Sequence, residues 1–315
     1  MEQKQRRINS ATYFFIVVTA VCFLATVLIN LLYTKGIIRG IEVKLNIVIS
    51  QSLILIPIIV YFIITKRKFT DVVRLKKTHP LMIIIVPIIA FAIIPLMTVI
   101  NALSMLVVDN RVSDVASVLV QKNSYGVALF FIALIPAIIE ELAYRGIVLG
   151  NYIEGSRLSA IVLSGFLFGI MHMNFNQMAY AFVLGIIFGF LLEATGSILS
   201  TMLVHFCING TSISLTYLAN KLAPLSEQLE KTELTDEALL QTVKIYAPLA
   251  VVGLVIAASL IFVLAMLNNR KDYFISIFKR TPKQPGEKKA RIATLPFIII
   301  VIVCIGICII DEFVL

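Results

Sequence analysis

Six polar residues that could perform chemistry lie in stretches of the chain that are otherwise strongly apolar. A carboxylate beside an imidazole can polarise a water molecule for attack on a carbonyl carbon, and it can later protonate the leaving amine. A second imidazole, together with a carboxamide, can donate hydrogen bonds to the oxyanion that forms. The set predicts hydrolysis of a carbonyl compound with an amine leaving group, and its members are Glu140, Glu141, Arg145, His172, His205 and Asn209.

The two adjacent carboxylates are distinguished by the residue that follows them. Arg145 lies four positions after Glu141, which is the helical spacing at which two side chains can pair. Pairing would keep that carboxylate charged and oriented. Glu140 is then expected to be the reactive carboxylate. His205 and Asn209 are also one helical turn apart, so they are expected on one face of a helix.

The elements that must position these residues are membrane helices. The 315 residues are 59% hydrophobic and only 14% charged, and the mean hydropathy is +0.98. We predict an all-α, polytopic transmembrane helix bundle with eight or nine spans, of which the fifth and sixth are short. The first span reads as a retained anchor, so no secreted mature domain is expected. The candidate spans are 13–33, 47–65, 81–103, 125–150, 158–174, 178–192, 197–219, 247–267 and 292–310.

The net charge of +9 is concentrated in a few loops, which argues against a nucleic-acid partner. Basic residues gather before the first span, after the second and after the eighth, and the positive-inside rule places all three segments in the cytoplasm. The amino terminus is then inside, and segment 220–246 and the carboxyl terminus are outside. We expect an integral multi-pass protein of a bacterial plasma membrane with lipids as partners. The tract 279–291 is interpreted as a topology signal rather than as an anionic-lipid site.

The spacing along the predicted helices can bring the chemical groups to one depth. If the fourth span runs through Tyr152 and turns at Ser156, Glu140 and His172 each lie sixteen positions from that turn, or about 24 Å. His205 and Asn209 lie roughly 13 and 19 Å from the turn at Gly196. The site is therefore expected among the fourth to seventh helices.

Several further residues have an expected structural role. Pro136, four residues before Glu140, is the intramembrane proline expected to matter most, Phe168 is expected to pack beside the cavity, and Glu193 is expected at the membrane interface. Thr235 with the acidic residues after it predicts the cap of a short external helix. Close packing of the fifth and sixth spans is predicted by two small-xxx-small pairs, Gly165 with Gly169 and Gly185 with Gly189.

Three motifs in series carry a family resemblance. Glu140-Glu141-xxx-Arg145, Phe168-xxx-His172 and His205-xxx-Asn209 resemble the signature of the CPBP intramembrane proteases, also called the Abi or CAAX-protease family, which includes the Ras-converting CAAX endopeptidases. The resemblance implies cleavage, within the membrane, of a membrane-associated or lipidated protein or peptide. By motif position, Glu140 and His172 would activate water, and His205 and Asn209 would stabilise the oxyanion.

The resemblance also implies a division of the chain and leaves the cofactor open. The catalytic core is expected at 125–215, between N-terminal helices in 1–124 and an external loop with C-terminal helices in 216–315. The family is commonly named as metalloproteases, and a metal-free, glutamate-activated water is the alternative. Two histidines with a carboxylate could hold zinc or another divalent metal, although no HExxH motif is present. The candidate ligands are Glu140, His172 and His205.

Two other classes of function remain open from the sequence. One is a non-proteolytic membrane scaffold or bacteriocin-immunity type protein that keeps the polar cluster for binding. The other is a proton-coupled transporter, because buried Glu, His and Arg also form proton relays. No pair of interrupted helices in matching halves supports the transporter. Single residues also have plain structural interpretations: either histidine could bond a neighbouring helix, and Arg145 could extend to the interface.

Overall fold

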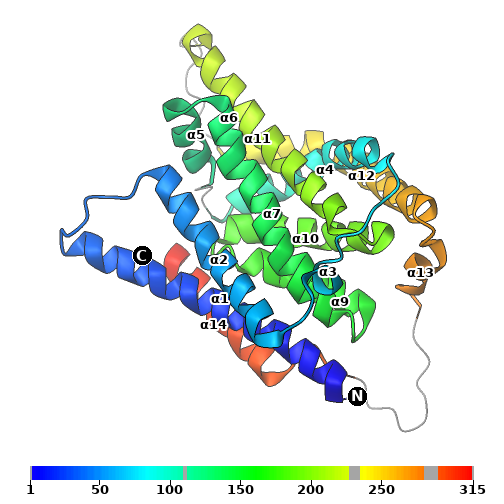
Figure 1. Cartoon of the computed structure of the whole chain (residues 1–315). Helices are drawn as coiled ribbons and strands as arrows, with labels where there is room; N and C mark the ends of the chain where they lie inside the picture. Colours follow the sequence, from blue (N-terminus) through cyan, green and yellow to red (C-terminus); the bar gives the residue numbers. More distant parts are fainter. Residues whose placement is uncertain (1, 109–111, 227–234, 280–289, 314–315) are drawn as a thin grey trace.

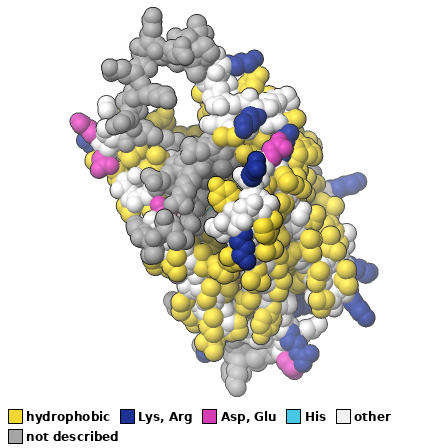
Figure 2. Space-filling view, turned by 90° about the vertical axis from the view of Figure 1, so that its left-hand side faces the viewer, with side chains coloured by type: hydrophobic (Ala, Val, Ile, Leu, Met, Phe, Trp, Pro, Cys, Tyr) yellow, Lys and Arg dark blue, Asp and Glu magenta, His cyan; other side chains and the backbone are white. Residues whose placement is uncertain are grey.

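The computed structural model is all-α and describes residues 2–108, 112–226, 235–279 and 290–313 (Figure 1). Seven of the described helices are long and apolar enough to cross a membrane, so the chain is a multi-pass integral membrane protein. In the part of Figure 2 that is not drawn in grey, hydrophobic side chains cover much of the surface, as a lipid-facing surface requires. The seven are α1 (Glu2–Thr34), α2 (Val43–Thr65), α4 (Met82–Met105), the composite helix Tyr125–Tyr152, α10 (Phe175–Thr195), α11 (Ile198–Ser226) and α12 (Asp236–Leu267).

The prediction of eight or nine spans needs correction, because two of the nine predicted segments are shorter helices. They are α9 (Arg157–Ile170) and α14 (Leu295–Phe313), whose apolar part is Leu295–Ile310. The 14 residues of α9 extend about 21 Å, less than the roughly 30 Å hydrocarbon core. Three short connecting helices complete the fold: α3 (Phe69–Val73), α5 (Val112–Lys122) and α13 (Lys271–Ser276).

The short α9 changes the position of His172. The sequence predicted this residue within a helix at 158–174, but α9 ends at Ile170 and His172 lies in the turn before α10. Asn174 begins α10 by accepting a hydrogen bond from the backbone N–H of Gln177 at 2.9 Å. Helix α10 is correspondingly longer than the predicted 178–192 segment. The tip of the α9–α10 hairpin therefore lies at membrane depth.

The two helices of this hairpin pack as closely as the glycine pattern predicted. A Cβ atom on Gly185 would lie 2.6 Å from the Cα of Gly165, and one on Gly169 would lie 2.8 Å from the carbonyl oxygen of Met178. Neither position can accept a side chain without a shift of backbone. The glycine pairs thus hold α9 against α10, on the side where the polar residues gather.

The composite helix Tyr125–Tyr152 contains two π-helical segments. Its parts are α6 (Tyr125–Ala128), the π segment Leu129–Leu134, α7 (Ile135–Glu141), the π segment Leu142–Leu149 and α8 (Gly150–Tyr152). The helix continues through Tyr152, as the prediction required. Segments of π-helix inside α-helices often accompany functional sites, and here they flank the turns that carry Glu140 and Glu141.

Pro136 explains part of this irregularity. Because proline has no N–H, the carbonyl group of Ile132 cannot receive the usual α-helical bond from position 136. The side-chain amide of Asn209 on α11 donates to that carbonyl oxygen instead, at 3.2 Å. A neighbouring helix therefore satisfies the freed backbone group, as the membrane interior requires.

The segments with the excess positive charge meet at one end of the molecule, called here the basic end. Arg7 pairs with Glu154 at 2.5 Å, and the backbone N–H of His79 donates to the Asn268 side chain at 3.0 Å. In Figure 1 the N-terminus and α13 lie toward the lower right, whereas α5 and α6 lie at the upper left. Residues 280–289 of the basic tract 279–291 are outside the described residues.

The opposite end, called the far end, contains a small hydrophobic core of its own. Its buried residues come from α5, the start of the composite helix and the outer part of α11, and they are Ala116, Leu119, Val120, Ala128 and Ile213.

The main core contains residues from α1, α2, α4, α9, α10, α11, α12 and α14. The membrane part of the chain therefore packs around one hydrophobic centre.

Helix α12 corrects the expectation of a short external helix. Thr235 caps its first turn by accepting from the backbone N–H of Ala238 at 3.3 Å, as predicted. The helix then continues for 32 residues to Leu267 and becomes a membrane span. Gly253 faces the backbone of Ala92 directly, so α12 and α4 are held in close contact.

Candidate active site

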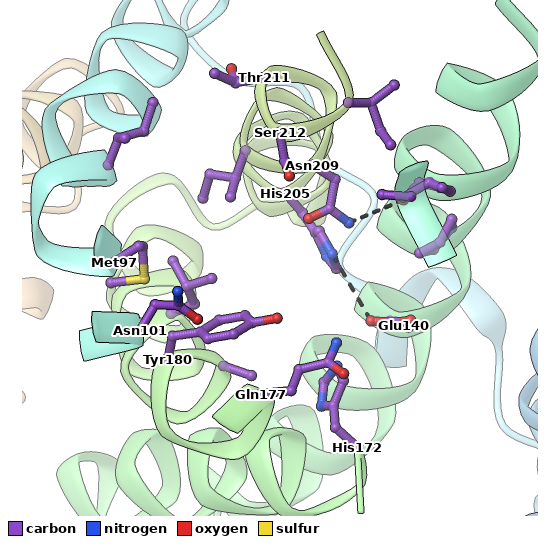
Figure 3. A pocket seen from close by; sticks show the side chains of 18 of the residues that line it. Met97, Asn101, Glu140, His172, Gln177, Tyr180, His205, Asn209, Thr211 and Ser212 are labelled. Atoms are coloured by element: carbon purple, nitrogen blue, oxygen red, sulfur yellow. Dashed lines mark hydrogen bonds and ion pairs between the residues drawn. The ribbon is translucent and has the colours of Figure 1, made fainter. Parts of the chain in front are cut away.

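A cavity of about 540 Å³ lies between α2, α4, α7, α10 and α11. Glu140, His172, His205 and Asn209 line it, and Figure 3 shows their side chains gathered around one space. The structure thus brings together four of the six predicted site residues. The other two, Glu141 and Arg145, lie behind the wall and contact it through His205 and Phe168.

Glu140 is buried but only lightly held. Its side chain comes from the last turn of α7, and the residue is 8% exposed. The amide of Gln51 on α2 donates to Oε1 at 3.1 Å, and Oε2 lies 3.9 Å from Nε2 of His205. Neither contact neutralises the carboxylate closely. Glu140 therefore presents its carboxylate oxygen atoms to the cavity.

Glu141, the adjacent carboxylate, is fully buried and firmly paired. Its Oε1 accepts from Nδ1 of His205 at 3.0 Å and lies 3.1 Å from Nη1 of Arg145. The predicted pairing of Glu141 with Arg145 is confirmed. Because a carboxylate only accepts, the proton lies on Nδ1 of His205, and its Nε2 is directed toward Glu140. Arg145 does not extend to the interface, since it is 2% exposed.

Two aromatic rings enclose the guanidinium of Arg145. Its Cζ lies 4.2 Å from the centre of the Phe168 ring and 4.9 Å from that of Phe188. A desolvated cation over an aromatic face gains about 2 kcal/mol. Phe168 also contacts the imidazoles of His172 and His205, with ring centres 5.2 and 6.0 Å away. The packing role predicted for Phe168 therefore includes fixing the charged group and both histidines.

His172 is oriented by the end of α9. Its Nδ1 lies 2.8 Å from the carbonyl oxygen of Phe168. A carbonyl oxygen is an acceptor, so Nδ1 carries the proton and Nε2 is left with its lone pair. Figure 3 shows the ring on the same side of the cavity as Glu140. The residue can thus accept a proton or a hydrogen bond from a molecule in the cavity.

Several polar residues of the cavity wall were missed from the sequence, among them Gln51, Gln177 and Tyr180. Gln51 had a usable signal, because it is a polar residue inside the apolar segment 47–65 and such residues are functional candidates. Tyr180 has no such signal, since an aromatic residue in a membrane helix usually packs. Figure 3 shows its hydroxyl group pointing into the space that Glu140 faces.

The structure shows how the three donors suggested for a metal, Glu140, His172 and His205, are arranged. Among the described residues, no group of three or more His, Cys, Asp or Glu side chains is placed to hold a metal ion. Nδ1 of His205 is bonded to Glu141 and Nδ1 of His172 to the backbone, which leaves one ring nitrogen on each. Glu140, His172 and His205 share the cavity without converging as ligands.

A third buried carboxylate, Glu193, lies near the end of α10 at the basic end of the molecule. This residue is 0% exposed. Nη1 of Arg74 lies 2.5 Å from its Oε1, the hydroxyl of Tyr273 donates to Oε2 at 2.6 Å, and Nη2 of Arg270 lies 3.8 Å from Oε2. Burial, and then the nearby Glu193, raise the pKa of Tyr273 to about 12. Both oxygens of Glu193 are therefore occupied by groups of the chain itself.

The comparison with known families gives a match for the segment that contains the residues of the candidate active site. Residues 122–211 match the family described as Type II CAAX prenyl endopeptidase Rce1-like. This segment is an Rce1-like domain. The match confirms the resemblance to the CAAX-protease family, and the domain contains all six predicted site residues. Neither the comparison with curated proteins nor that with solved structures gives a match.

The Rce1-like domain does not enclose the cavity alone. Gln51 of α2, which bonds Glu140, and Ile93, Met97 and Asn101 of α4 complete the wall. These helices precede the matched range. Part of the surface that a substrate would contact therefore comes from sequence outside the domain.

Proposed function

We propose that the protein is an intramembrane endopeptidase that hydrolyses a peptide bond of a membrane-associated or lipidated protein or peptide. The observation that carries the proposal is the gathering of Glu140, His172, His205 and Asn209 around one buried cavity in an Rce1-like domain. Intramembrane ionisable residues are costly and are retained for function. The cavity also provides space for substrate beside them.

In this proposal Glu140 and His172 activate a water molecule. The Glu140 carboxylate accepts a proton as the water oxygen attacks the carbonyl carbon, and it returns the proton to the leaving amine. The free Nε2 of His172 accepts the second hydrogen of the same water and so orients it. The light pairing of Glu140 supports its role, because a fully neutralised carboxylate would be a poor base.

His205 and Asn209 would stabilise the oxyanion. With Nδ1–H donated to Glu141, His205 would donate to the oxyanion from Nε2 in its doubly protonated form, in which both ring nitrogens are donors. Asn209 uses one amide hydrogen on Ile132 and keeps a second for substrate. Donors held in a dry site are worth about 3–4 kcal/mol each in such reactions.

No step is routed through a metal, because the three candidate ligands do not converge. If zinc or another divalent ion were bound, Nε2 of each histidine and the Glu140 carboxylate would be the donors available. We therefore expect hydrolysis to survive a chelator. Loss of activity on chelation, restored by one divalent ion, would replace the metal-free mechanism with a metal-assisted one.

The test is cleavage of a peptide library and of membrane proteins by the purified protein in detergent. Wild type, Glu140→Gln and His172→Ala are compared with and without chelator, and Glu154→Gln, a carboxylate at the basic end, is the matched control. We expect cleavage by wild type and Glu154→Gln and none by the other two. The same products from all four proteins would rule out the peptidase and favour a scaffold, an immunity factor or a transporter.

A further inference from the structure

We propose that the cavity opens at the far end of the molecule, so that its substrate is a polypeptide that reaches the site from the extracytoplasmic side of the membrane. This inference rests on the proposed peptidase function, since it states from which side that site is filled. It is carried by three observations: the exposure of the cavity wall, the direction of the helices that form it, and the distribution of charge.

The exposed fraction of the residues that line the cavity rises from one end of the cavity to the other. Phe188 and Ile93 are 0% exposed, and His205 is 5% exposed. At the other end, Ser212 is exposed and Leu215 is 59% exposed. His205 and Leu215 both line the cavity from α11, and their separation of ten positions corresponds to about 15 Å along the helix. The cavity is thus closed beyond His205 and open near Leu215.

The helices show which end is open. Helix α11 begins at the basic end, where Ser197 donates to the backbone oxygen of Lys76 at 2.6 Å, and its exposed lining residues follow the buried ones. Helix α4 also begins there and contributes Ile93 before Asn101. Helix α2 runs in the opposite direction, and its lining residue Ser50, which is exposed, lies near its start. All three helices place the mouth at the far end.

The distribution of basic residues between the two ends places the far end outside the cytoplasm. The loop between α1 and α2, at the far end, contains Lys35 and Arg39. The loop between α2 and α4, at the basic end, contains three times as many basic residues, and the amino terminus and the segment after α12 add more. By the positive-inside rule the basic end is cytoplasmic. The six basic residues of the α2–α4 loop are Lys66, Arg67, Lys68, Arg74, Lys76 and Lys77.

The chemistry of the wall between mouth and base fits a polypeptide segment. Its polar groups are uncharged hydroxyls and amides that can bond backbone N–H and C=O groups, and no Lys or Arg is among the described lining residues. Without a Lys or Arg, this part of the described wall offers no permanent counter-charge for a terminal carboxylate or a phosphate. The expected occupant is an uncharged internal segment of an exported or membrane-anchored polypeptide. The hydroxyl and amide residues toward the mouth are Ser50, Thr98, Asn101, Thr211, Ser212 and Thr216.

The test is labelling of single cysteines with a membrane-impermeant maleimide in intact and permeabilised cells. Cys22, Cys207, Cys304 and Cys308 are first replaced by alanine in the Glu140→Gln protein, so that the result does not depend on catalysis. Ser212→Cys reports the mouth, with Thr216→Cys as a second variant if the first is not produced as folded protein. Lys35→Cys is the far-end control and Lys279→Cys the basic-end control; both side chains are exposed.

We expect Ser212→Cys and Lys35→Cys to be labelled in intact cells and Lys279→Cys only after permeabilisation. Labelling of Ser212→Cys only after permeabilisation, or in neither state, would overturn the proposal. Because labelling needs no catalysis, the expected pattern together with no cleavage by wild type would support the direction of the cavity and count against the peptidase. Products cut only in cytoplasmic segments would overturn the assigned substrate class.

Discussion

Glu140 and Glu193 are both buried carboxylates in membrane helices, and their surroundings differ in one respect that separates chemistry from structure. Glu193 is held by Arg74 at 2.5 Å, Tyr273 at 2.6 Å and Arg270 at 3.8 Å. Glu140 has Gln51 at 3.1 Å and His205 at 3.9 Å, and it faces a cavity. The first carboxylate is saturated by its own chain, and the second retains capacity for a substrate and water.

Glu141 shows that the difference between a structural and a reactive carboxylate depends on how the carboxylate is paired and not on its position in the sequence. It is adjacent to Glu140 and more deeply buried, yet its Oε1 is shared between His205 and Arg145. Its task is to orient the imidazole that faces the cavity. The motif Glu140-Glu141 therefore combines both kinds of carboxylate, one lightly paired and one firmly paired.

The largest effect is expected at His172, which belongs to the cavity. Its Nδ1 bonds only backbone carbonyl groups of its own turn, so His172→Ala should leave the melting temperature nearly unchanged while cleavage falls about 10²–10⁴-fold, or about 3–5 kcal/mol. His79→Ala, at the basic end, is the matched control and should remain active. Equal loss of activity in both variants would show that the assay reports folding rather than chemistry.

The opposite result is expected at Arg74, which belongs to the saturated cluster. Arg74→Ala leaves Glu193 buried without its closest cation, and breaking a buried ion pair costs about 3–5 kcal/mol of stability. Cleavage per folded molecule should be unchanged, because Arg74 does not line the cavity. Thermal unfolding in detergent measures the loss, with the exposed neighbour Lys68→Ala as control. Equal melting temperatures for the two variants would mean that the cluster contributes little to stability.

A smaller effect should separate the two roles of Asn209. Asn209→Ala leaves the carbonyl of Ile132 without its donor, at a cost of about 1–3 kcal/mol of stability. Pro136→Ala restores an N–H that can bond this carbonyl, so Asn209→Ala should cost much less stability in that background. The loss of cleavage should persist, because the proposed oxyanion donor is still missing. The same stability loss in both backgrounds would contradict the assigned bond between Asn209 and Ile132.

The smallest effect concerns Tyr273 and depends on pH. Tyr273→Phe removes one hydrogen bond to Glu193, worth about 1.5–3 kcal/mol when the acceptor is charged. The pKa of Tyr273 is raised from its ordinary value of 10 to about 12, so the bond stabilises the folded state below pH 10 and is lost as the pH rises toward 12. The difference in melting temperature between wild type and Tyr273→Phe should therefore be constant below pH 10 and shrink above it. A difference that grows with pH would contradict this sign.

The sequence predicted contacts that follow from spacing along a helix better than contacts that depend on how the helices are rotated. The pairing of Glu141 with Arg145 and the close packing at Gly165 and Gly185 followed from helical spacing, which is a local property. The bond between His205 and Glu141 could not be predicted, because it depends on the rotation of α11 relative to α7.

Two other features, the burial of Glu193 and the position of His172, could not be predicted from the sequence either, because they depend on the tertiary structure. Glu193 is buried because Arg74 and Arg270, from loops far apart in the sequence, reach it together. The position of His172 in a turn follows from the early end of α9 at Ile170, which the apolar residues Met171 and Met173 did not mark. The structure is therefore needed to show which charged groups are buried by distant partners. It is also needed to show where a helix ends within the membrane.

The most direct test of the comparison is to make the same substitution at its two carboxylates. Glu140→Gln and Glu193→Gln are purified in parallel, and cleavage per folded molecule and melting temperature are measured for each. We predict that Glu140→Gln abolishes cleavage and leaves the melting temperature near that of wild type, whereas Glu193→Gln lowers the melting temperature and cleaves normally. Cleavage by Glu140→Gln at the wild-type rate would contradict the account.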